Sequence, residues 1–432
     1  MDKPLYLQLY TYYKNAIMQN QMKAYTKMPS IRELAQKHNL SKTTIEKAYN
    51  QLLIEGFIQS QPKSGHYVLP IQHQSFNRTA TVKPKIHEPS YQNIAQPKQT
   101  FHLDAFKRAI NHVIHNQTEA LYHPPKTSGE PLLKDAIITH LRHERGVKAN
   151  SDQVLIDSGM QTHLKTLGNM TNKRRIGYLI PLFHQAKKVF ELLNFQLIPF
   201  TSLDKMLNAT LDFIYISPSN LYPSGEVIGF NERVKLIDYA KKADAYIIED
   251  DYNYIYRHNA YQIPSIQSLS NGEHVIYIGS FTRQLLPSLR LSYMVLPPSL
   301  MIRYQKREPL SQNVSTLDQL VIAHFIQSGA YQKHLRKLSS FSKKQNELMR
   351  KTLLKCTHPA VTYSGLESNL HVLFTLEDQN IKSQLIQLFN EANWFYRFIE
   401  EWPNTLLLPY HGFLDDDFLR LQKWFIKIES HS

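Results

Sequence analysis

The chain contains a single cysteine, Cys356, among its 432 residues. One cysteine excludes an internal disulfide framework and is typical of a protein from a reducing compartment. The sequence has no uninterrupted apolar run of membrane-spanning length, and its first residues, MDKPLYLQLY, lack the apolar core of a signal peptide. We therefore expect a cytoplasmic protein with no membrane partner.

Two common nucleotide fingerprints are also missing, because neither GxGxxG nor a P-loop occurs in the sequence. Glycine is scarce, with 14 residues, which is about half of its usual share. Lys and Arg, in contrast, exceed Asp and Glu by 50 to 36, giving a net charge of +14. This excess favours a polyanionic partner, although basic composition alone is weak evidence for nucleic-acid binding.

A chain of this length is too long for one core, so we expect two or three domains. Residues 1–70 carry nine Lys/Arg against four Asp/Glu. In MPSIRELAQKH, Ser30 and Glu33 have the spacing of a capping box, which predicts a helix start. In LSKTTIEKAYNQLLIEGF a second helix starts at Ser41 and ends at Gly56. Its buried face has helical spacing and comprises Ile45, Ala48, Tyr49, Leu52 and Leu53.

The second of these helices presents polar and basic residues outward, namely Lys42, Thr43, Thr44, Lys47 and Asn50. The next segment, FIQSQPKSGHYVLP, reads as a hairpin whose turn contains Lys63 and Gly65. A small helical domain with solvated polar faces is the simpler interpretation of one helix pair. The order of helix, helix, helix and hairpin, with basic residues on the second helix of the pair and the hairpin tip, instead favours a winged helix-turn-helix that binds DNA.

Nearly all of residues 3–69 resembles the winged-helix domain of GntR-type bacterial repressors, through PLYLQLY, MPSIRELAQKHNLSKTTIEKAYNQLLIEGFI and SGHYV. The resemblance implies that Ser30 and Arg32 grip phosphate and that the recognition helix starts at Ser41, Lys42, Thr43 and Thr44. It also implies a wing glycine at Gly65. We expect Lys47 and Lys63 to contribute to the same interface, with double-stranded operator DNA as the partner.

Residues 71–100 lose periodicity and read as a linker. From residue 101 onward, helical patterns alternate with six β-rich runs: QVLIDSG, RIGYLIP, LDFIYISPS, DAYIIEDDY, HVIYIGSF and LSYMVLP. This alternation predicts an α/β domain at 101–432 with a mostly parallel sheet, and ligands in such sheets bind at the carboxyl ends of the strands. We expect a smaller C-terminal subdomain at about 310–432.

Several possible metal ligands occur in this domain without forming a specific pattern. Glu249, Asp250 and Asp251 follow a strand, but no histidine lies in register with them. His112 with His115 and His140 with His143 have helical spacing but no evident third ligand. Surface histidines and solvated carboxylates are the more frequent explanation, so we expect no metal.

The ordered set of motifs over about residues 101–428 resembles the aminotransferase fold that uses pyridoxal phosphate (PLP). The quoted segments are YHPPKTSGEPLLKDAIITHLRHERGV, DSGMQTHL, IPLF, SPSNLYPSG, EDDY and GSFTRQLLPSLR. The resemblance implies a phosphate-binding turn, an aromatic ring on the pyridine, partners for its nitrogen and phenolic oxygen, and a phosphate clamp. The resemblance places the phosphate-binding turn at Gly159, Met160 and Gln161 and the stacking ring at Phe183. It assigns Asp250 to the pyridine nitrogen and Tyr252 to the phenolic oxygen. Ser280 and Thr282 would lie near the phosphate, with Arg290 as its clamp. A winged helix joined to this fold resembles the MocR-type regulators.

The chain departs from the aminotransferase pattern at the positions that carry chemistry. Arg283 stands where the resemblance implies the Schiff-base lysine, and a guanidinium forms no stable Schiff base. Leu407 stands at our best register for the arginine that binds the substrate carboxylate. Ser288 and Ser292 replace glycines usual around the lysine loop. We therefore expect no catalytic residue and no transamination by the ordinary route.

Three functions remain in consideration. The leading one is a homodimeric transcriptional regulator whose second domain dimerises and senses an effector. The effector would be noncovalent PLP or another anionic small molecule, bound by Arg283 and the residues that the aminotransferase resemblance assigns to PLP. A rival is a PLP-dependent aminotransferase with a DNA-binding head, which requires another lysine in the pocket. The third is a purely structural second domain without a ligand. The sequence does not identify the target genes, the operator or the direction of regulation.

Overall fold

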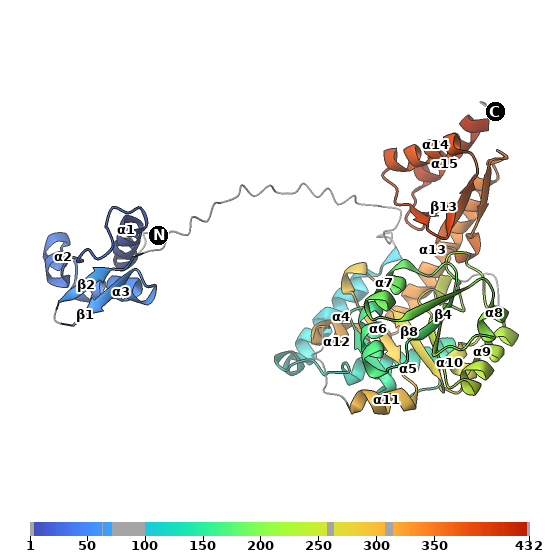
Figure 1. Ribbon diagram of the computed structural model, residues 1–432, viewed down its shortest axis with the longest axis horizontal. Coiled ribbons are helices and arrows are strands. Elements are labelled where there is room, and N and C mark those ends of the chain that lie inside the picture. The colour runs from blue at the N-terminus through green and yellow to red at the C-terminus, as the bar shows by residue number, and fades with distance from the viewer. Residues whose placement is uncertain (1–3, 63, 71–99, 257–262, 307–313, 430–432) are drawn as a thin grey trace. The chain divides into compact units, whose positions relative to one another are not determined.

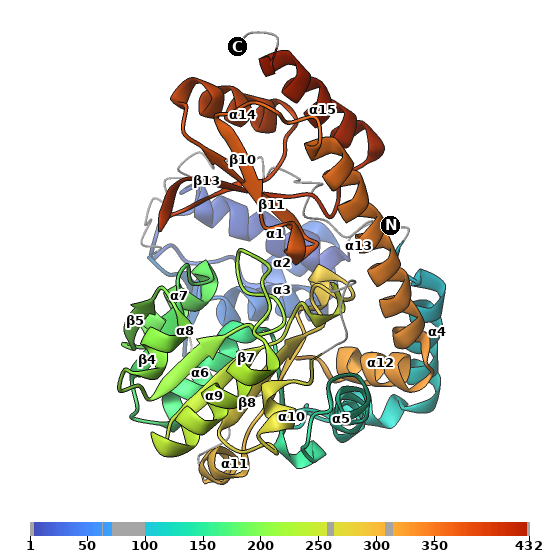
Figure 2. The same ribbon diagram turned by 90° about the vertical axis from the view of Figure 1, so that its right-hand side faces the viewer.

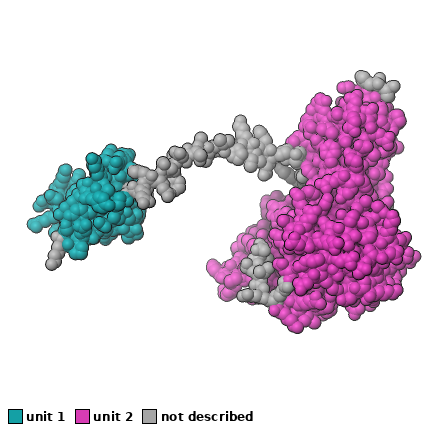
Figure 3. Space-filling model, in the orientation of Figure 1, with its two compact units in different colours: residues 1–88 teal, residues 89–432 magenta. Residues whose placement is uncertain are grey.

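The structure is a computed structural model that describes residues 4–62, 64–70, 100–256, 263–306 and 314–429. Lys63 lies outside these described residues. The chain divides into two compact units, residues 1–88 and 89–432 (Figure 3). No helix within the described ranges combines the length and the apolar character needed to cross a membrane.

The first unit has three helices and a two-stranded hairpin, in the order predicted from the sequence (Figure 1). The elements are α1 (Leu5–Met18), α2 (Ile31–His38), α3 (Lys42–Ile54), β1 (Ile58–Gln61) and β2 (Gly65–Val68). The capping box is confirmed: Ser30 Oγ accepts from the Glu33 amide at 3.1 Å, and the Glu33 carboxylate accepts from the Ser30 amide at 3.0 Å. Ile45, Ala48, Tyr49 and Leu52 form the buried face of α3.

The first helix is attached to the end of α3 by a polar cluster. Lys14 Nζ lies 2.8 Å from the Glu55 carboxylate, and the Tyr10 hydroxyl donates to the same group at 2.6 Å. A hydrogen bond from Gln51, together with those from Lys14 and Tyr10, lowers the pKa of Glu55 to about 2. Glu55 is the residue that ends α3, so the cluster fixes α1 against the recognition-helix candidate.

The second unit contains a seven-stranded sheet in the order β3-β9-β8-β7-β6-β4-β5. The pairs among β4, β5, β6, β7 and β8 are parallel, whereas β9 is antiparallel to both neighbours. The predicted mostly parallel sheet is confirmed, and all six predicted β runs form strands. The strands are β3 (Val154–Asp157), β4 (Arg175–Leu179), β5 (Gln196–Phe200), β6 (Phe213–Ile216), β7 (Tyr246–Asp250), β8 (Val275–Ser280) and β9 (Ser292–Val295).

Helices cover both faces of this sheet (Figure 2). Ile247 and Ile248, which are adjacent in β7, belong to hydrophobic clusters on opposite faces, as the alternation of side chains along a strand requires. The helices are α4 (Leu103–Asn116), α5 (Pro131–Arg145), α6 (Met160–Met170), α7 (His184–Leu192), α8 (Leu203–Leu207), α9 (Phe230–Lys242), α10 (Ile266–Leu269), α11 (Pro298–Gln305) and α12 (Thr316–Gln327).

A second, antiparallel sheet has the strand order β10-β11-β13-β12. Its strands are β10 (Val361–Ser364), β11 (His371–Leu376), β12 (Arg397–Ile399) and β13 (Trp402–Pro409). The long helix α13 (Ala330–Leu353) packs with this sheet through Met349 and Leu353, together with α14 (Gln379–Glu391) and α15 (Asp415–Glu429). The carboxyl ends of the parallel strands β4, β6, β7 and β8 meet at one edge of the large sheet, and the loops that leave this edge carry the predicted pocket residues.

Candidate functional site

The first candidate site is the exposed polar surface of α2 and α3. Ser30 caps α2, and Arg32 is exposed in its first turn. Because the Ser30 oxygen accepts from the helix backbone, its hydroxyl hydrogen is left to donate to an outside acceptor. A helix start with a hydroxyl and a guanidinium has the chemistry to bind phosphate.

The start of α3 carries a cluster of hydroxyl groups. Ser41 Oγ accepts from the Thr44 amide at 3.2 Å and lies 2.9 Å from Thr43 Oγ1 and 2.8 Å from Thr44 Oγ1. Lys42, Thr43 and Lys47 are exposed, whereas Thr44 is half-buried. Thr44 is therefore less accessible than the outward position predicted for it, because the cap holds it against the helix start.

The hairpin following α3 forms the predicted wing. Gly65 has φ 116°, a backbone conformation that L side chains rarely adopt, and it begins β2 directly after the turn. Ser64 Oγ lies 2.7 Å from the Tyr67 hydroxyl across this turn. Position 65 therefore requires glycine for backbone reasons, in addition to any contact with a ligand.

In the second unit, Gly159, Met160 and Gln161 form the start of α6 beside Arg290. Gly159 has φ 135° and precedes α6 without a side-chain cap. A Cβ atom at Gly159 would lie 3.3 Å from Arg290 Nη2, and that guanidinium also donates to the Ser158 carbonyl at 3.5 Å. Uncapped helix amides beside a guanidinium can bind an anion.

Two further predicted residues lie at the end of β8, which pairs with β9 close to Arg290. Ser280 Oγ accepts from the Thr282 amide at 3.2 Å, so these two residues form a small turn of their own. Ser292, which replaces a usual glycine, donates its hydroxyl to the Asp157 carbonyl at 3.0 Å. The hydroxyl thus has a structural partner.

Three aromatic rings, Phe183, Tyr222 and Tyr252, form what we call the aromatic frame. The Phe183 and Tyr252 rings are stacked with centroids 6.4 Å apart, and the Tyr222 ring meets Phe183 edge-on at 5.6 Å. They come from the loops after β4, β6 and β7, which converge because parallel strands end at one edge. The structure therefore brings together Phe183 and Tyr252, two of the residues assigned from the sequence, and adds Tyr222.

Asp250 is buried at the end of β7, where the Tyr215 hydroxyl donates to its Oδ2 at 2.5 Å. Burial raises the pKa of Asp250 to about 7, and Asp251 adds to this rise. The Tyr215 hydrogen bond and the Arg283 charge oppose the rise. Burial therefore favours the protonated form of this carboxyl group more than it is favoured in an exposed aspartate.

Arg283 extends over the aromatic frame from the loop after β8. Its guanidinium carbon lies 5.5 Å from the centroid of the Tyr252 ring, which is a cation–π distance. Its charge also reaches two buried histidines: burial lowers the pKa of His371 and of His411 to about 4, and Arg283 contributes to both shifts. The guanidinium is thus an exposed charged group beside Tyr252 of the aromatic frame.

Leu407 is buried in β13 and supplies no charge. Its partner on the neighbouring strand is Arg397, which opposes Leu407 in the β12–β13 register. Burial raises the pKa of Tyr222, and the Arg397 guanidinium counteracts this through its charge and a hydrogen bond to the hydroxyl. The Arg283 charge also counteracts the raised pKa of Tyr222, more weakly than Arg397 does.

A cavity of about 250 Å³ borders Tyr222 and Arg397. It is lined by Pro181, Leu182, His184, Lys187, Tyr222, Arg397, Phe398, Ile399, Glu400 and Glu401. Lys187 is the lysine of this lining, and its Nζ lies 2.8 Å from the Glu400 carboxylate. That hydrogen bond raises the pKa of Lys187. A lysine held protonated in an ion pair is a poor nucleophile.

The remaining carboxylates and the paired histidines have other partners. Glu249 accepts from the amides of Ile266 and Gln267 at the start of α10, and Asp251 pairs with buried Arg145 at 2.7 Å. The His112 ring stacks on His324, and His140 lies within hydrogen-bond distance of the Tyr254 hydroxyl. His143 contacts Glu144, and His115 is exposed. Across the described part of the chain, no three His, Cys, Asp or Glu residues are grouped to hold a metal.

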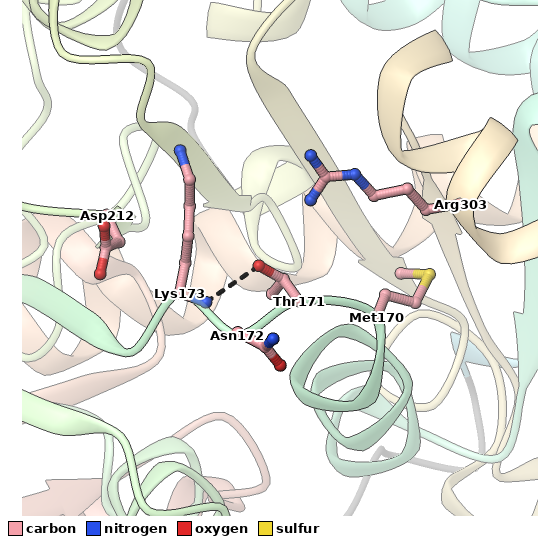
Figure 4. Close-up of a pocket in the computed structure, with 6 residues that line it drawn as sticks. All are labelled: Met170, Thr171, Asn172, Lys173, Asp212 and Arg303. Atoms are coloured by element: carbon pink, nitrogen blue, oxygen red, sulfur yellow. Dashed lines mark hydrogen bonds between the residues drawn. The ribbon is translucent and has the colours of Figure 1, made fainter.

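A separate hollow of about 620 Å³ lies among Met170, Thr171, Asn172, Lys173, Asp212 and Arg303 (Figure 4). The Lys173 amide donates to Thr171 Oγ1 at 3.1 Å. Lys173 lies two residues before β4 and Asp212 immediately precedes β6, so this hollow is at the amino ends of the strands. It is therefore at the opposite edge of the sheet from Arg283 and the aromatic frame.

Sequence reasoning missed five pocket residues: Tyr215, Tyr222, His371, Arg397 and His411. A local signal existed for the tyrosines, because LDFIYISPS and SPSNLYPSG were already assigned to this edge. Arg397, His371 and His411 reach this region because of how the strands of the second sheet pair and pack. Their positions follow from tertiary contacts that have no periodic pattern in the sequence.

The comparisons with known proteins agree with both units. Residues 5–68 match the family model described as "Bacterial regulatory proteins, gntR family". The chain is 30% identical to the uncharacterized HTH-type transcriptional regulator YhdI of Bacillus subtilis (strain 168), over 97% of this chain and 94% of that protein. It is 28% identical to the probable rhizopine catabolism regulatory protein MocR of Rhizobium meliloti, over 78% and 74% of the two chains.

Among solved structures, the second unit is similar to the kynurenine aminotransferase of Pyrococcus horikoshii. The TM-score is 0.66 at 21% identity, over 78% of this chain and 89% of that chain. This likeness establishes the aminotransferase fold and leaves the chemistry open. With its helix-turn-helix unit and that fold, the chain belongs to the MocR-like subfamily of the GntR family of bacterial regulatory proteins and is a DNA-binding transcriptional regulator.

Proposed function

We propose that this regulator uses its aminotransferase-like domain as a noncatalytic ligand sensor. The observation that carries the proposal is the Arg283 guanidinium above Tyr252, at the position where the aminotransferase resemblance implies the nucleophilic lysine. A group that stays charged cannot attack an aldehyde. The paired state of Lys187 supports the same conclusion, because the lysine that lines the neighbouring cavity is occupied by Glu400.

The residues fit a PLP molecule held without a covalent bond. The α6 start with Gly159 and Arg290 would take its phosphate, Asp250 its ring nitrogen and Phe183 one face of its ring. When bound with a lysine partner, this cofactor supplies an electron sink for reactions of amino acids. Without that partner, the pocket residues bind and orient the molecule but have no group that carries out the transfer.

Other small anions fit the pocket as well. Arg283 and Arg397 both act on the Tyr222 hydroxyl, so a carboxylate beside this hydroxyl would meet two guanidinium groups. Guanidinium groups bind carboxylates bidentately, which favours this class of ligand. A ligand of this kind regulates only if it binds the DNA-competent and DNA-incompetent states with different affinities.

We also propose that the protein is a homodimer through its second unit. Large apolar side chains are exposed on α4 and α5 and between them, including Leu103, Ile114, Tyr122 and Leu132. Groups of exposed apolar side chains often mark interfaces between subunits. Sedimentation equilibrium should give twice the mass of the chain, and a monomer at micromolar concentration would refute this part.

In the DNA complex, we assign Ser30 and Arg32 to phosphate and the exposed residues Lys42, Thr43 and Lys47 of α3 to the major groove. Ser41 and Thr44 hold the start of α3, and Gly65 begins the second strand of the wing. We keep Lys63 as a DNA contact on the basis of the sequence. This assignment follows the geometry of winged helix-turn-helix complexes, in which phosphate contacts position the recognition helix.

The test of the sensor proposal compares the wild-type protein with an Arg283→Lys variant. Each is titrated with PLP, reduced with borohydride and analysed by intact mass and peptide mapping. We expect a stoichiometric adduct at position 283 in the variant, because the lysine restores the nucleophile, and no stoichiometric adduct in the wild type. A stoichiometric wild-type adduct at Lys187 or another pocket lysine would restore the enzyme interpretation.

A further inference from the structure

The long helix α13 carries an unusually one-sided charge. Its 24 residues, AYQKHLRKLSSFSKKQNELMRKTL, contain seven Lys/Arg and a single acidic residue, Glu347. All seven cations are exposed, while the opposite face is buried through residues such as Tyr331, Leu338 and Met349. We call these cations the α13 stripe: Lys333, Arg336, Lys337, Lys343, Lys344, Arg350 and Lys351.

The stripe has a regular spacing along the helix. Three adjacent pairs of cations, at positions 336 and 337, 343 and 344, and 350 and 351, repeat every seven residues. Seven residues are close to two helical turns, so the pairs stay on one face and recur about every 10 Å. From Lys333 to Lys351 the stripe extends for about 27 Å at the rise of an α-helix.

Within the described ranges, six of the seven cations of the stripe form no ion pair. Among the described residues, Arg350 is the one member of the stripe in an ion pair, with Glu367 at 2.7 Å. Other exposed helices mix their charges: α9 combines Lys235, Lys241 and Lys242 with Glu232 and Asp238. Like charges on one helix face repel one another. Binding of an external anion to the stripe would reduce this repulsion.

The stripe continues into a basic hollow at its amino-terminal end. This hollow has a volume of about 370 Å³ and is lined by His102, Ala105, Arg108, His324, Ser328, Ala330 and Lys333, with no acidic side chain. In Figure 2, α13 runs from the second sheet to α4 and α12, the helices that contribute the other basic residues. Lys333 and Arg108 are the Lys/Arg residues of this lining, so the cationic surface extends from α13 to the adjoining part of α4.

We infer that the α13 stripe is a second DNA-binding surface, which binds the phosphate backbone of duplex DNA next to the site bound by the winged helix. The inference rests on the DNA-binding function of the first unit, because that unit delivers a long polyanion to the second unit of the same chain. Tethering makes the second contact effectively intramolecular, so modest phosphate contacts contribute to total affinity. The stripe presents flexible cations rather than a helix start aimed at bases, so it contributes affinity and salt dependence without sequence preference.

The experiment uses the full chain with four substitutions, Arg336→Gln, Lys337→Gln, Lys343→Gln and Lys344→Gln. The matched control loses the same charge elsewhere on the second unit, through Lys188→Gln, Lys205→Gln, Lys241→Gln and Lys242→Gln. Circular dichroism verifies folding of both variants. DNA affinity is measured by anisotropy against salt concentration, on random-sequence duplexes of about six and about one and a half helical turns.

On the long duplex, we expect the slope of log affinity against log salt to fall by about 3 to 4 in the α13 variant, since each lost phosphate contact removes about 0.9. Between 50 and 200 mM salt, this difference corresponds to about a 10²-fold change in relative affinity. On the short duplex, and in the control variant on either duplex, the slope should stay close to that of the wild type.

Equal slopes for the wild type and the α13 variant on the long duplex would overturn the inference. A loss confined to single-stranded RNA or to vesicles containing an anionic lipid would also overturn it, in favour of another polyanion. An Arg32→Ala, Lys42→Ala variant of the full chain separates the two claims. If that variant weakens DNA binding while the α13 variant does not, the stripe inference fails and the winged-helix function stands.

Discussion

Replacement of His411 by phenylalanine should remove a defined part of the acid sensitivity of the second unit. His411 follows β13 and is buried between the rings of Tyr256 and Phe341, with centroid distances of 5.5 and 5.6 Å. Within the described residues, neither ring nitrogen has a hydrogen-bond partner. The His411 ring therefore packs against aromatic rings, and this environment disfavours the protonated, charged form of the imidazole.

The direction and size of the effect follow from the pKa of His411. Burial, with a contribution from Arg283, lowers this pKa from 6.5 in the unfolded chain to about 4. As the pH falls below 6.5, the unfolded chain takes up a proton that the folded protein does not, so folding stability decreases until about pH 4. Between pH 7 and pH 5, this histidine alone removes about 2 kcal/mol of unfolding free energy.

The His411→Phe variant keeps an aromatic ring and cannot take up this proton. At pH 7 we expect it to be about 1 kcal/mol more stable than the wild type, because it removes an unpartnered buried polar group. The assay is urea denaturation at pH 7 and pH 5 followed by tryptophan fluorescence. The three tryptophans, Trp394, Trp402 and Trp424, all belong to the second unit, so the signal reports on the domain that contains the substitution.

The matched control is His115→Gln, which alters an exposed histidine on α4. This control should lose as much stability between pH 7 and pH 5 as the wild type, whereas His411→Phe should lose about 2 kcal/mol less. If His411→Phe and the wild type lose the same amount, the reasoning from burial and from the neighbouring Arg283 charge is wrong.

Three further substitutions test the phosphate contacts of the first unit and a buried ion pair of the second. Arg32→Ala and Lys42→Ala should each lower the salt slope of DNA binding by about 0.9 while leaving the circular dichroism spectrum unchanged; unchanged slopes in both variants would contradict the phosphate assignment. Asp251→Asn should destabilise the second unit by about 3 to 5 kcal/mol, because it leaves the buried Arg145 charge without its counter-ion. Chemical denaturation measures this effect, and a change below about 1 kcal/mol would mean that the ion pair is not a structural requirement.

Local patterns account for the parts of the fold that the sequence predicted well. The Ser30 cap and the buried face of α3 follow from side chains within one or two helical turns, and the six β runs are rich in β-branched and aromatic residues. Strand β5 was not predicted. Its sequence, QLIPF, contains Pro199, which is tolerated because β5 is an edge strand with one side unpaired.

The pocket was predictable only where its residues follow strands directly. Asp250 and Phe183 lie just after strands that the sequence identifies, and parallel strands bring such positions together. Arg397 could not be found in this way, because its position opposite Leu407 depends on the β12–β13 register, which contains an irregularity after Phe398. His371 and His411 likewise approach Arg283 only when the second sheet has packed near the loop after β8.

The most direct test of the central claim is selection of bound sequences from a randomised duplex DNA library by the full-length protein. A regulator that reads bases with α3 should enrich one motif, and the proposed homodimer should enrich it as two half-sites. A Lys42→Ala, Lys47→Ala variant should lose or alter that motif. Recovery of sequences no different from the starting library by the folded wild-type protein would contradict the claim that this chain is a sequence-specific DNA-binding regulator.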